Sequence, residues 1–253
     1  MRWSAAEVEA HEKDMQRYIA ATEASIAHTV RYDNSCVDFN APIEKDDRNL
    51  NTKVEVFNVD TVTALMHKSV KGKVAVLNFA SYNYPGGGYI KGASAQEECL
   101  CQESNLYSVL KAFDDSYYAP HRKYNNGGLY SNEALYTPDI LFKGMKSVDV
   151  ITCAAPNATR ALECVDLTKV EETMRERIKF VLEIAYKQGV KTLILGAYGC
   201  GVFGNDPKFV AETFKNLLET RYSNIFERVI FAVINGRGAE NYEIFKKVLK
   251  PFC

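Results

Sequence analysis

The feature that most constrains the fold is a series of short apolar runs rich in β-branched residues, with helical patterns between them. Five runs are predicted as strands, covering residues 54–59, 74–79, 149–154, 192–197 and 228–234. They are apolar almost throughout, as strands are when both faces of the sheet are covered. The alternation predicts an α/β fold with a largely parallel or mixed sheet between helical layers.

Helix-start signals lie between the predicted strands. Thr168-x-x-Glu171 is predicted to be a capping box, because a threonine with a glutamate three residues later satisfies two free backbone N–H groups. Asp206-Pro207 predicts an N-cap followed by a proline in the first turn. A last helix is expected over residues 240–249.

Three further segments complete this outline. Ser4-x-x-Glu7 predicts a helix start near the N-terminus, and one continuous helix is expected from residue 96 through residue 110. Residues 117–146 show little periodicity and are predicted to be a long ordered excursion. With no repeat or flexible linker in the sequence, we expect a single domain over residues 1–253.

Composition narrows the class of protein. The chain has 253 residues, a net charge of −1 and seven scattered cysteines. The charge gives no broad basic surface for nucleic acid, and no apolar run is long enough for a transmembrane helix. The N-terminus does not resemble a secretion signal. We therefore expect a cytoplasmic or nuclear protein with reduced cysteines that binds neither membranes nor nucleic acid directly.

A glycine loop followed by paired acids is the first candidate site. Gly86, Gly87 and Gly88 follow a predicted strand and remove every side chain at one place, so a ligand could lie against bare backbone. Glu97 and Glu98 come about ten residues later, at a predicted helix start, and diverge by about 100° there. A carboxyl close to a second acid and shielded by a ligand would have the raised pKa that a general acid needs. On these grounds alone, a solvated helix N-terminus remains an equal alternative.

A second glycine loop lies at residues 199–204 and matches G-x-G-x-x-G between a strand and a helix. A dinucleotide fold is disfavoured, because only one strand and one helix remain before the chain ends. Backbone N–H groups and the helix beginning at Pro207 still favour a phosphate or pyrophosphate in this loop. The alternative is that these glycines serve only a tight turn.

Together, these motifs resemble the signature of the bacterial-type poly(ADP-ribose) glycohydrolases. The resemblance lies in Pro85-Gly-Gly-Gly88 followed by Gln96-Glu-Glu98, and extends through "HRKYNNGGLYSNEALYTPDILF", "VDVITCAAPNA" and "LGAYGCGVFGND". It covers the chain from about Thr52 onward, and residues 1–50 resemble that family's N-terminal helical extension. The resemblance implies a macrodomain-like three-layer α/β/α sandwich with a mixed central sheet. It also implies hydrolysis of the ribose–ribose O-glycosidic bonds of poly(ADP-ribose), releasing ADP-ribose.

The resemblance also implies residue roles. Glu98 would donate a proton to the departing 2′-oxygen of the ribose and then act as base, while Glu97 would bind ribose hydroxyls. The implied substrate-binding residues are Gly86, Gly87, Gly88, Gln96, Gly199, Cys200, Gly201, Val202, Phe203, Gly204, Asp60 and Asn78. Phe203 would pack beside the distal ribose and Asp60 would contact adenine. Asn78 and Asn235 would end strands at the ligand face.

No cofactor and no metal are expected. The expected partners are poly(ADP-ribose) or ADP-ribosylated proteins, with ADP-ribose as product, and the chain is expected to be a monomer. Alternatives are a macrodomain reader of ADP-ribose, or a hydrolase of mono-ADP-ribosylated targets or O-acetyl-ADP-ribose. A nicotinamide oxidoreductase, a cysteine hydrolase using Cys200 and His121, and a metal site at Cys99-x-Cys101 fit the spacings poorly.

Overall fold

A computed structural model describes residues 5–44, 51–67, 70, 72–144, 146–235 and 240–250. Its strands form one mixed sheet in the order β1-β4-β5-β3-β6-β7-β2. They are β1 Val30–Tyr32, β2 Lys53–Phe57, β3 Val74–Phe79, β4 Ala134–Phe142, β5 Lys146–Cys153, β6 Thr192–Leu195 and β7 Arg228–Ala232. All five predicted strands are confirmed in type, with shifts of up to three residues at their ends.

The parallel part of the sheet determines where the loops meet. Strand β3 pairs in parallel with β5 on one side and with β6 on the other. The series continues in parallel through β7 to β2. On the other side of β3, β4 and β1 continue the sheet beyond β5 as antiparallel strands. The segments that follow β3, β5 and β6 therefore all leave the sheet at the carboxyl ends of these strands. Ligands of open α/β sheets bind at this edge.

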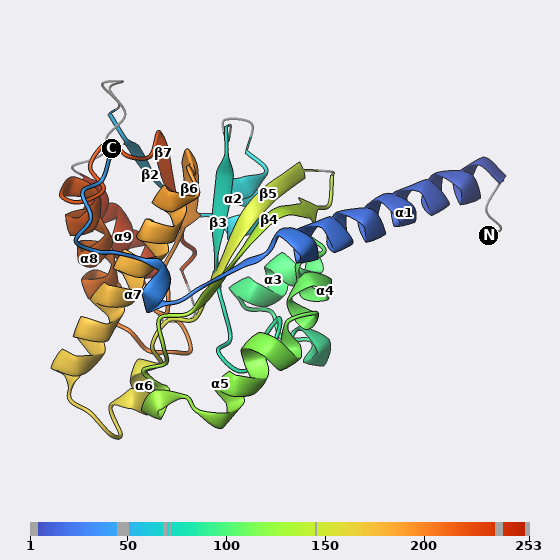
Figure 1. Cartoon of the computed structure of the whole chain (residues 1–253). Coiled ribbons are helices and arrows are strands. Elements are labelled where there is room, and N and C mark those ends of the chain that lie inside the picture. The colour runs from blue at the N-terminus through green and yellow to red at the C-terminus, as the bar shows by residue number, and fades with distance from the viewer. Residues whose placement is uncertain are drawn as a thin grey trace.

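Helical layers cover both faces of the sheet (Figure 1). The α-helices are α1 Ala5–His28, α2 Thr61–Leu65, α3 Gln96–Gln102, α4 Leu106–Lys111, α5 Ala119–Lys123, α6 Ala158–Ala161, α7 Leu167–Lys187, α8 Pro207–Glu219 and α9 Asn241–Leu249. Helices α7, α8 and α9 pack on one face, and α2, α3, α4 and part of α1 pack on the other. This is the three-layer α/β/α sandwich with a mixed sheet that the sequence predicts.

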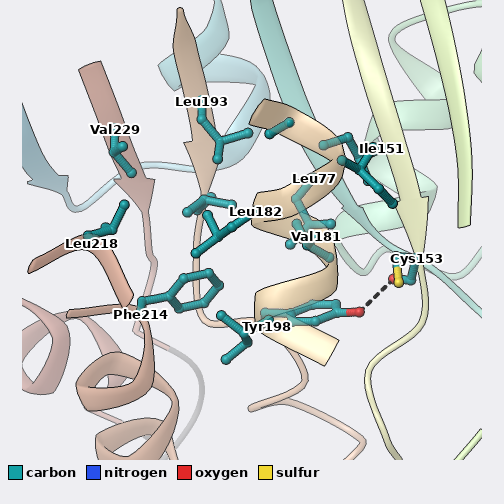
Figure 2. Packing of buried hydrophobic residues seen from close by; sticks show 14 of the residues in the cluster. Leu77, Ile151, Cys153, Val181, Leu182, Leu193, Tyr198, Phe214, Leu218 and Val229 are labelled. Carbon is teal, nitrogen blue, oxygen red and sulfur yellow. Dashed lines mark hydrogen bonds between the residues drawn. The ribbon is translucent and has the colours of Figure 1, made fainter. Parts of the chain in front are cut away.

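The core alternates along each central strand. In β3, Ala75 and Leu77 point into the cluster under α7 and α8, while Val74 and Val76 point into the opposite cluster. Figure 2 shows the first cluster, where Leu77 packs among residues from neighbouring strands and helices. Because both faces are buried, the strands read as continuous apolar runs in the sequence.

One predicted helix cap is confirmed and one is wrong. Asp206 caps α8 by accepting the backbone N–H of Lys208, as predicted. The predicted capping box beginning at Thr168 is wrong, because α7 already begins at Leu167 and Asp166 is its N-cap. The Asp166 carboxylate accepts the N–H of Lys169 at 2.9 Å. An aspartate two residues upstream thus takes the capping position.

The predicted continuous helix from residue 96 to residue 110 is interrupted. Helix α3 ends at Gln102 and α4 begins at Leu106, with Ser104 and Asn105 between them. Asn105 N donates to Leu141 O, and Leu141 N donates to the Asn105 side chain. The segment between the helices therefore pairs with the end of β4, a partner far away in sequence that overrides the local helical pattern.

Two other predictions need correction. The excursion predicted for residues 117–146 contains β4, whose register shifts between Thr137 and Ile140. The N-terminal segment is helical as predicted, but it continues into β1, which joins the sheet beside β4. The predicted helix start at Ser4 lies outside the described residues. Within the described residues, no helix is long and apolar enough to cross a membrane.

Replacing Asp166 with alanine should lower the free energy of unfolding by about 1 kcal/mol, because a helix N–H loses its acceptor. Urea unfolding followed by circular dichroism measures this change. Thr168→Ala is the matched control: Thr168 is exposed in the first turn of α7, so the change should stay below about 0.5 kcal/mol. A larger loss at Thr168 than at Asp166 would contradict the assigned cap.

Candidate active site

The carboxyl end of β3 and the first turn of α3 together place two carboxylates beside the glycine loop. Glu97 is 3 % exposed, and its side chain contacts the loop that follows β3. Its Oε2 accepts the N–H of Ser81 at 2.7 Å, and its Oε1 accepts the side-chain amide of Asn78 at 3.1 Å. Asn78 near the end of β3 and Ser81 in the loop that follows thus fix this carboxyl in one orientation.

Glu98 is held by backbone N–H groups. Its Oε1 accepts the N–H of Gly88 at 2.8 Å, and its Oε2 accepts the N–H of Ala95, the residue that precedes α3, at 3.1 Å. The side chain is 8 % exposed, slightly more than that of Glu97. The two adjacent acids therefore do not diverge into solvent, as the solvated-terminus alternative would require. Both turn toward the glycine loop.

The glycines are what make this approach possible. A Cβ at Gly87 would lie 2.6 Å from Glu98 Oε1, closer than real Cβ atoms come, and 3.0 Å from Glu97 Oε2, tighter than most real contacts. Gly87 also has a φ of +58°, which side chains rarely adopt. A Cβ at Gly86 would meet the ring of Tyr107 at 2.8 Å. The carboxylates therefore require bare backbone at Gly87, and the Tyr107 ring requires it at Gly86.

Burial changes the acidity of Glu97. Removal from water raises the pKa of Glu97 to about 8, with the charge of Glu98 adding to the effect and hydrogen bonds from Ser81 and Asn78 opposing it. The sequence predicts a raised pKa for a carboxyl that is shielded and close to a second acid, and Glu97 meets this description. A carboxyl with this pKa is largely protonated at neutral pH and can donate a hydrogen bond.

Three other predicted residues lie close by, with their side chains engaged by the protein. The Gln96 amide accepts the N–H of Phe79 at 2.8 Å and donates to Leu77 O at 2.9 Å. Asn78 is fully buried, and its Oδ1 has no hydrogen-bond partner among the residues that the structure describes. Asp60 caps α2 by accepting the N–H and the hydroxyl of Thr63. The side chains of Gln96 and Asn78 thus hold the start of α3, which carries the two carboxylates, against the end of β3.

The second glycine loop, residues 199–204, follows β6 at the same edge of the sheet. Gly199 has a φ of +72°, and a Cβ there would lie 2.7 Å from the Cβ of Ala155. A Cβ at Gly204 would meet the Thr159 hydroxyl at 2.5 Å. At Gly201, in contrast, a Cβ would lie within 4 Å of no atom in the described part of the chain. The tight turn explains the outer glycines but not the central one.

The remaining loop residues differ in exposure. Val202 is 88 % exposed, and Phe203 is partly buried against Tyr130 and Tyr82. Burial raises the pKa of the Cys200 thiol well above its usual value, which keeps it protonated and poorly nucleophilic. Its thiol contacts Tyr198 O, whereas the His121 ring contacts Tyr82 O and Glu133. This arrangement argues against a Cys200–His121 hydrolase.

Sequence reasoning missed the aromatic residues that connect the two loops. Phe79 at the end of β3 contacts Tyr198 before the second loop, with ring centroids 5.5 Å apart. Tyr130 contacts Phe203 at 6.0 Å. Asn235, predicted to lie at the ligand face, accepts the N–H of Tyr242 at the start of α9. No sequence signal marks the Phe79–Tyr198 and Tyr130–Phe203 contacts, because each joins residues distant in the chain.

A groove of about 360 Å³ lies away from this edge, between α7 and α8, and is lined by residues that include Arg175, Lys179 and Phe209. Another cavity, of about 310 Å³, lies at the opposite edge of the sheet beside Lys73 and Asp149. Neither contains the carboxylates or a glycine-loop residue. The candidate site is defined by the two loops and not by these hollows.

Comparisons with known proteins agree on one family. A family model described as the catalytic domain of microbial-type PARG matches residues 5–143. The structure of poly(ADP-ribose) glycohydrolase from Thermomonospora curvata is similar with a TM-score of 0.83 and 31% identity, over 90% of this chain and 88% of that one. A comparison with curated protein sequences gave no significant match.

Two further solved structures are similar and contain ligands. Poly(ADP-ribose) glycohydrolase from Deinococcus radiodurans in complex with ADP-ribose has a TM-score of 0.80 and 32% identity, covering 92% of this chain and 98% of that one. The Thermomonospora curvata enzyme bound to the inhibitor ADP-HPD has a TM-score of 0.80 and 32% identity, over 90% and 88% of the two chains. The coverages of 90% and 92% extend the similarity well beyond residue 143.

Wild-type protein should lose stability relative to Glu97→Gln as the pH rises from about 5 to about 8.5. The folded state keeps a proton on Glu97 up to its pKa of about 8, whereas the unfolded chain releases it near the ordinary value of 4.5, so this group opposes folding increasingly across that window. Urea unfolding of both proteins at several pH values measures the difference. A constant difference would contradict the assigned protonation of Glu97.

Proposed function

The chain belongs to the microbial-type poly(ADP-ribose) glycohydrolase family, and from this premise we propose that it hydrolyses the ribose–ribose O-glycosidic bonds of poly(ADP-ribose), releasing ADP-ribose. Residues 1–253 would act as one catalytic domain. The single observation that carries the proposal is the pair of adjacent carboxylates, Glu97 and Glu98, both turned against the bare backbone of the glycine loop.

Glu98 is the proposed acid and base. Its carboxyl lies against the Gly87–Gly88 backbone and is the more exposed of the two, so a glycosidic bond lying along the loop would come within its reach. As an acid it protonates the departing 2′-oxygen while positive charge develops at the anomeric carbon of the distal ribose. It then takes a proton from the water that attacks this carbon, which completes hydrolysis.

Glu97 has a different proposed role. With its pKa raised to about 8, it is largely neutral at physiological pH, so the pair does not place two full negative charges side by side. Its oxygens are already oriented by Ser81 and Asn78, and its proton is free to donate to a ribose hydroxyl. Glu97 thereby orients the bond that Glu98 cleaves.

The loop at residues 199–204 is the proposed diphosphate site. Its backbone precedes α8, whose N-terminal end carries a partial positive charge. The glycine at position 201 has no explanation in the packing of the described residues, as expected if a ligand lies where its side chain would be. A diphosphate held here would also stabilise the positive charge that develops on the neighbouring ribose.

Glu98→Gln should abolish release of ADP-ribose from poly(ADP-ribose), because the amide cannot donate or accept the transferred proton, while ADP-ribose still binds. Labelled polymer, with separation of monomer and oligomer products, measures turnover, and calorimetry measures binding. Glu103→Gln is the matched control: it lies at the end of the same helix, where Glu103 pairs with Lys143, and it should retain activity. Normal turnover by Glu98→Gln would remove the mechanism.

Gly201→Val should fold normally, because a side chain there meets no described atom, yet it should weaken ADP-ribose binding by about tenfold or more through intrusion on the diphosphate. Thermal unfolding and calorimetry measure the two properties. Leu167→Thr, at an exposed apolar position outside both glycine loops, serves as the control. Unchanged affinity of Gly201→Val would show that the diphosphate lies elsewhere.

A further inference from the structure

Four rings form a continuous column beside the candidate site. The Tyr82 ring is stacked between His121, with centroids 4.0 Å apart, and Tyr130, at 4.1 Å, both nearly parallel to it. Tyr130 in turn meets Phe203 edge-on at 6.0 Å. We call these residues, His121, Tyr82, Tyr130 and Phe203, the aromatic column.

The aromatic column joins the two loops on which the proposed chemistry depends. Tyr82 lies next to Ser81, whose N–H fixes Glu97, and three residues before Pro85 at the start of the glycine loop. Phe203 belongs to the loop at residues 199–204. The distance between the carboxylates and the proposed diphosphate site is therefore spanned by packed rings, which resist compression better than a flexible chain does.

Tyr130 is held in an unusual backbone conformation. Its φ is +62°, a left-handed value that is rare for a bulky aromatic residue. The fully buried Arg177 donates to the backbone carbonyl of the preceding residue, Leu129, at 3.3 Å, and to the side chain of Asn132 at 2.6 Å. Strain of this kind persists only where the surroundings impose it, and it is concentrated at functional sites.

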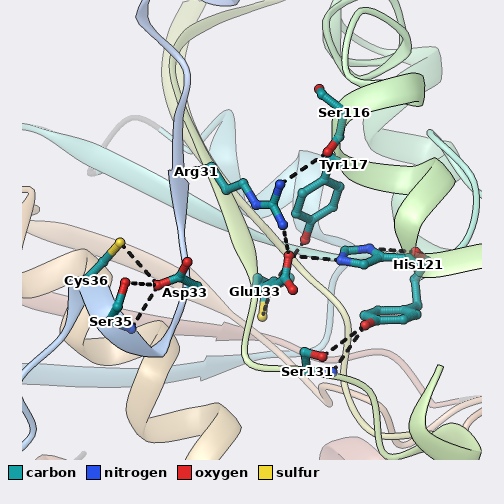
Figure 3. Close-up of polar contacts among 11 residues, drawn as sticks. Arg31, Asp33, Ser35, Cys36, Ser116, Tyr117, His121, Ser131 and Glu133 are labelled. Atoms are coloured by element: carbon teal, nitrogen blue, oxygen red, sulfur yellow. Dashed lines mark hydrogen bonds and ion pairs between the residues drawn. The ribbon is translucent and has the colours of Figure 1, made fainter. Parts of the chain in front are cut away.

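The base of the column is anchored by charged groups. His121 Nδ1 lies 3.1 Å from Tyr82 O, and its Nε2 lies 3.1 Å from the Glu133 carboxylate, which also pairs with Arg31 of β1 at 2.5 Å. Figure 3 shows Glu133 between Arg31 and His121, with the ring of Tyr117 beside them. Tyr82 is therefore held by its carbonyl as well as by its ring.

We propose that Tyr130, through the aromatic column, is a positioning residue that sets the glycine loop and its carboxylates at the correct distance from the diphosphate loop. This inference rests on the proposed function. Tyr130 is 7 % exposed and acts through Tyr82 and Phe203, without a role in proton transfer. Without its ring, ADP-ribose still binds to the second loop, but the scissile bond lies out of line with Glu98.

The test compares Tyr130→Leu, Tyr130→Phe and Tyr130→Gly on poly(ADP-ribose). Tyr130→Leu should lower kcat about tenfold or more, with the Kd for ADP-ribose changed by less than about threefold. Tyr130→Phe keeps the stacking ring and should restore kcat. Tyr130→Gly accepts the positive φ without strain and lacks the ring, so it separates the ring from the backbone if the leucine variant does not fold. Tyr124→Leu, at an exposed tyrosine nearby, is the matched control.

The outcomes are distinguishable. If wild type releases ADP-ribose and the ring-deleted variants keep its kcat, the positioning role is overturned and the proposed function stands. A parallel loss of kcat, ADP-ribose affinity and thermal stability would show that the column only stabilises the fold. If wild type does not cleave the polymer, the proposed function fails and the positioning role fails with it. Loss of kcat alone, rescued by phenylalanine, supports the role.

Discussion

The parallel pairing of β3 with both β5 and β6 is the constraint on which the site depends. Because the three strands run in the same direction, the chain leaves each of them at the same edge of the sheet. The glycine loop after β3 and the loop after β6 are thereby brought together although more than 100 residues separate them in sequence. Alternate side chains of β3 also pack against the helical layers on the two faces of the sheet. The same strand therefore determines both the hydrophobic core and the position of the site.

The carboxylates depend on that strand in turn. Asn78 is the penultimate residue of β3, and its side-chain amide orients Glu97. The side-chain amide of Gln96 accepts the N–H of Phe79 and donates to the carbonyl of Leu77. Burying Glu97 among these groups costs free energy if it is charged, and its raised pKa is the expression of that cost. The surroundings of Glu97, and not its neighbours in the sequence, thus set its pKa.

The sequence predicted those parts of the fold that are specified locally. Strand β3 has its predicted bounds, and Asp206-Pro207 begins α8 as expected, because burial on two faces and helix capping leave a short-range signature. Strand β4 was missed because Pro138 and Asp139 interrupt its pattern where its register shifts. The break after α3 was missed because its cause, pairing of Asn105 with Leu141, is not local. Of the site, the two acids and both glycine loops could be predicted, whereas the raised pKa of Glu97 required its burial.

The aromatic column shows why support for a site is harder to predict than the site itself. Its four residues lie on four separate segments, namely Tyr82, His121, Tyr130 and Phe203. In the sequence, each one alone is typical of a ring in or near a core. Only the fold brings them into line. The ion pair of Arg31 with Glu133 extends this support to β1, which the N-terminal helix places at the edge of the sheet. β1 is therefore joined to the loop that follows β3, and a change in β1 has a structural path to the carboxylates through Glu133, His121 and Tyr82.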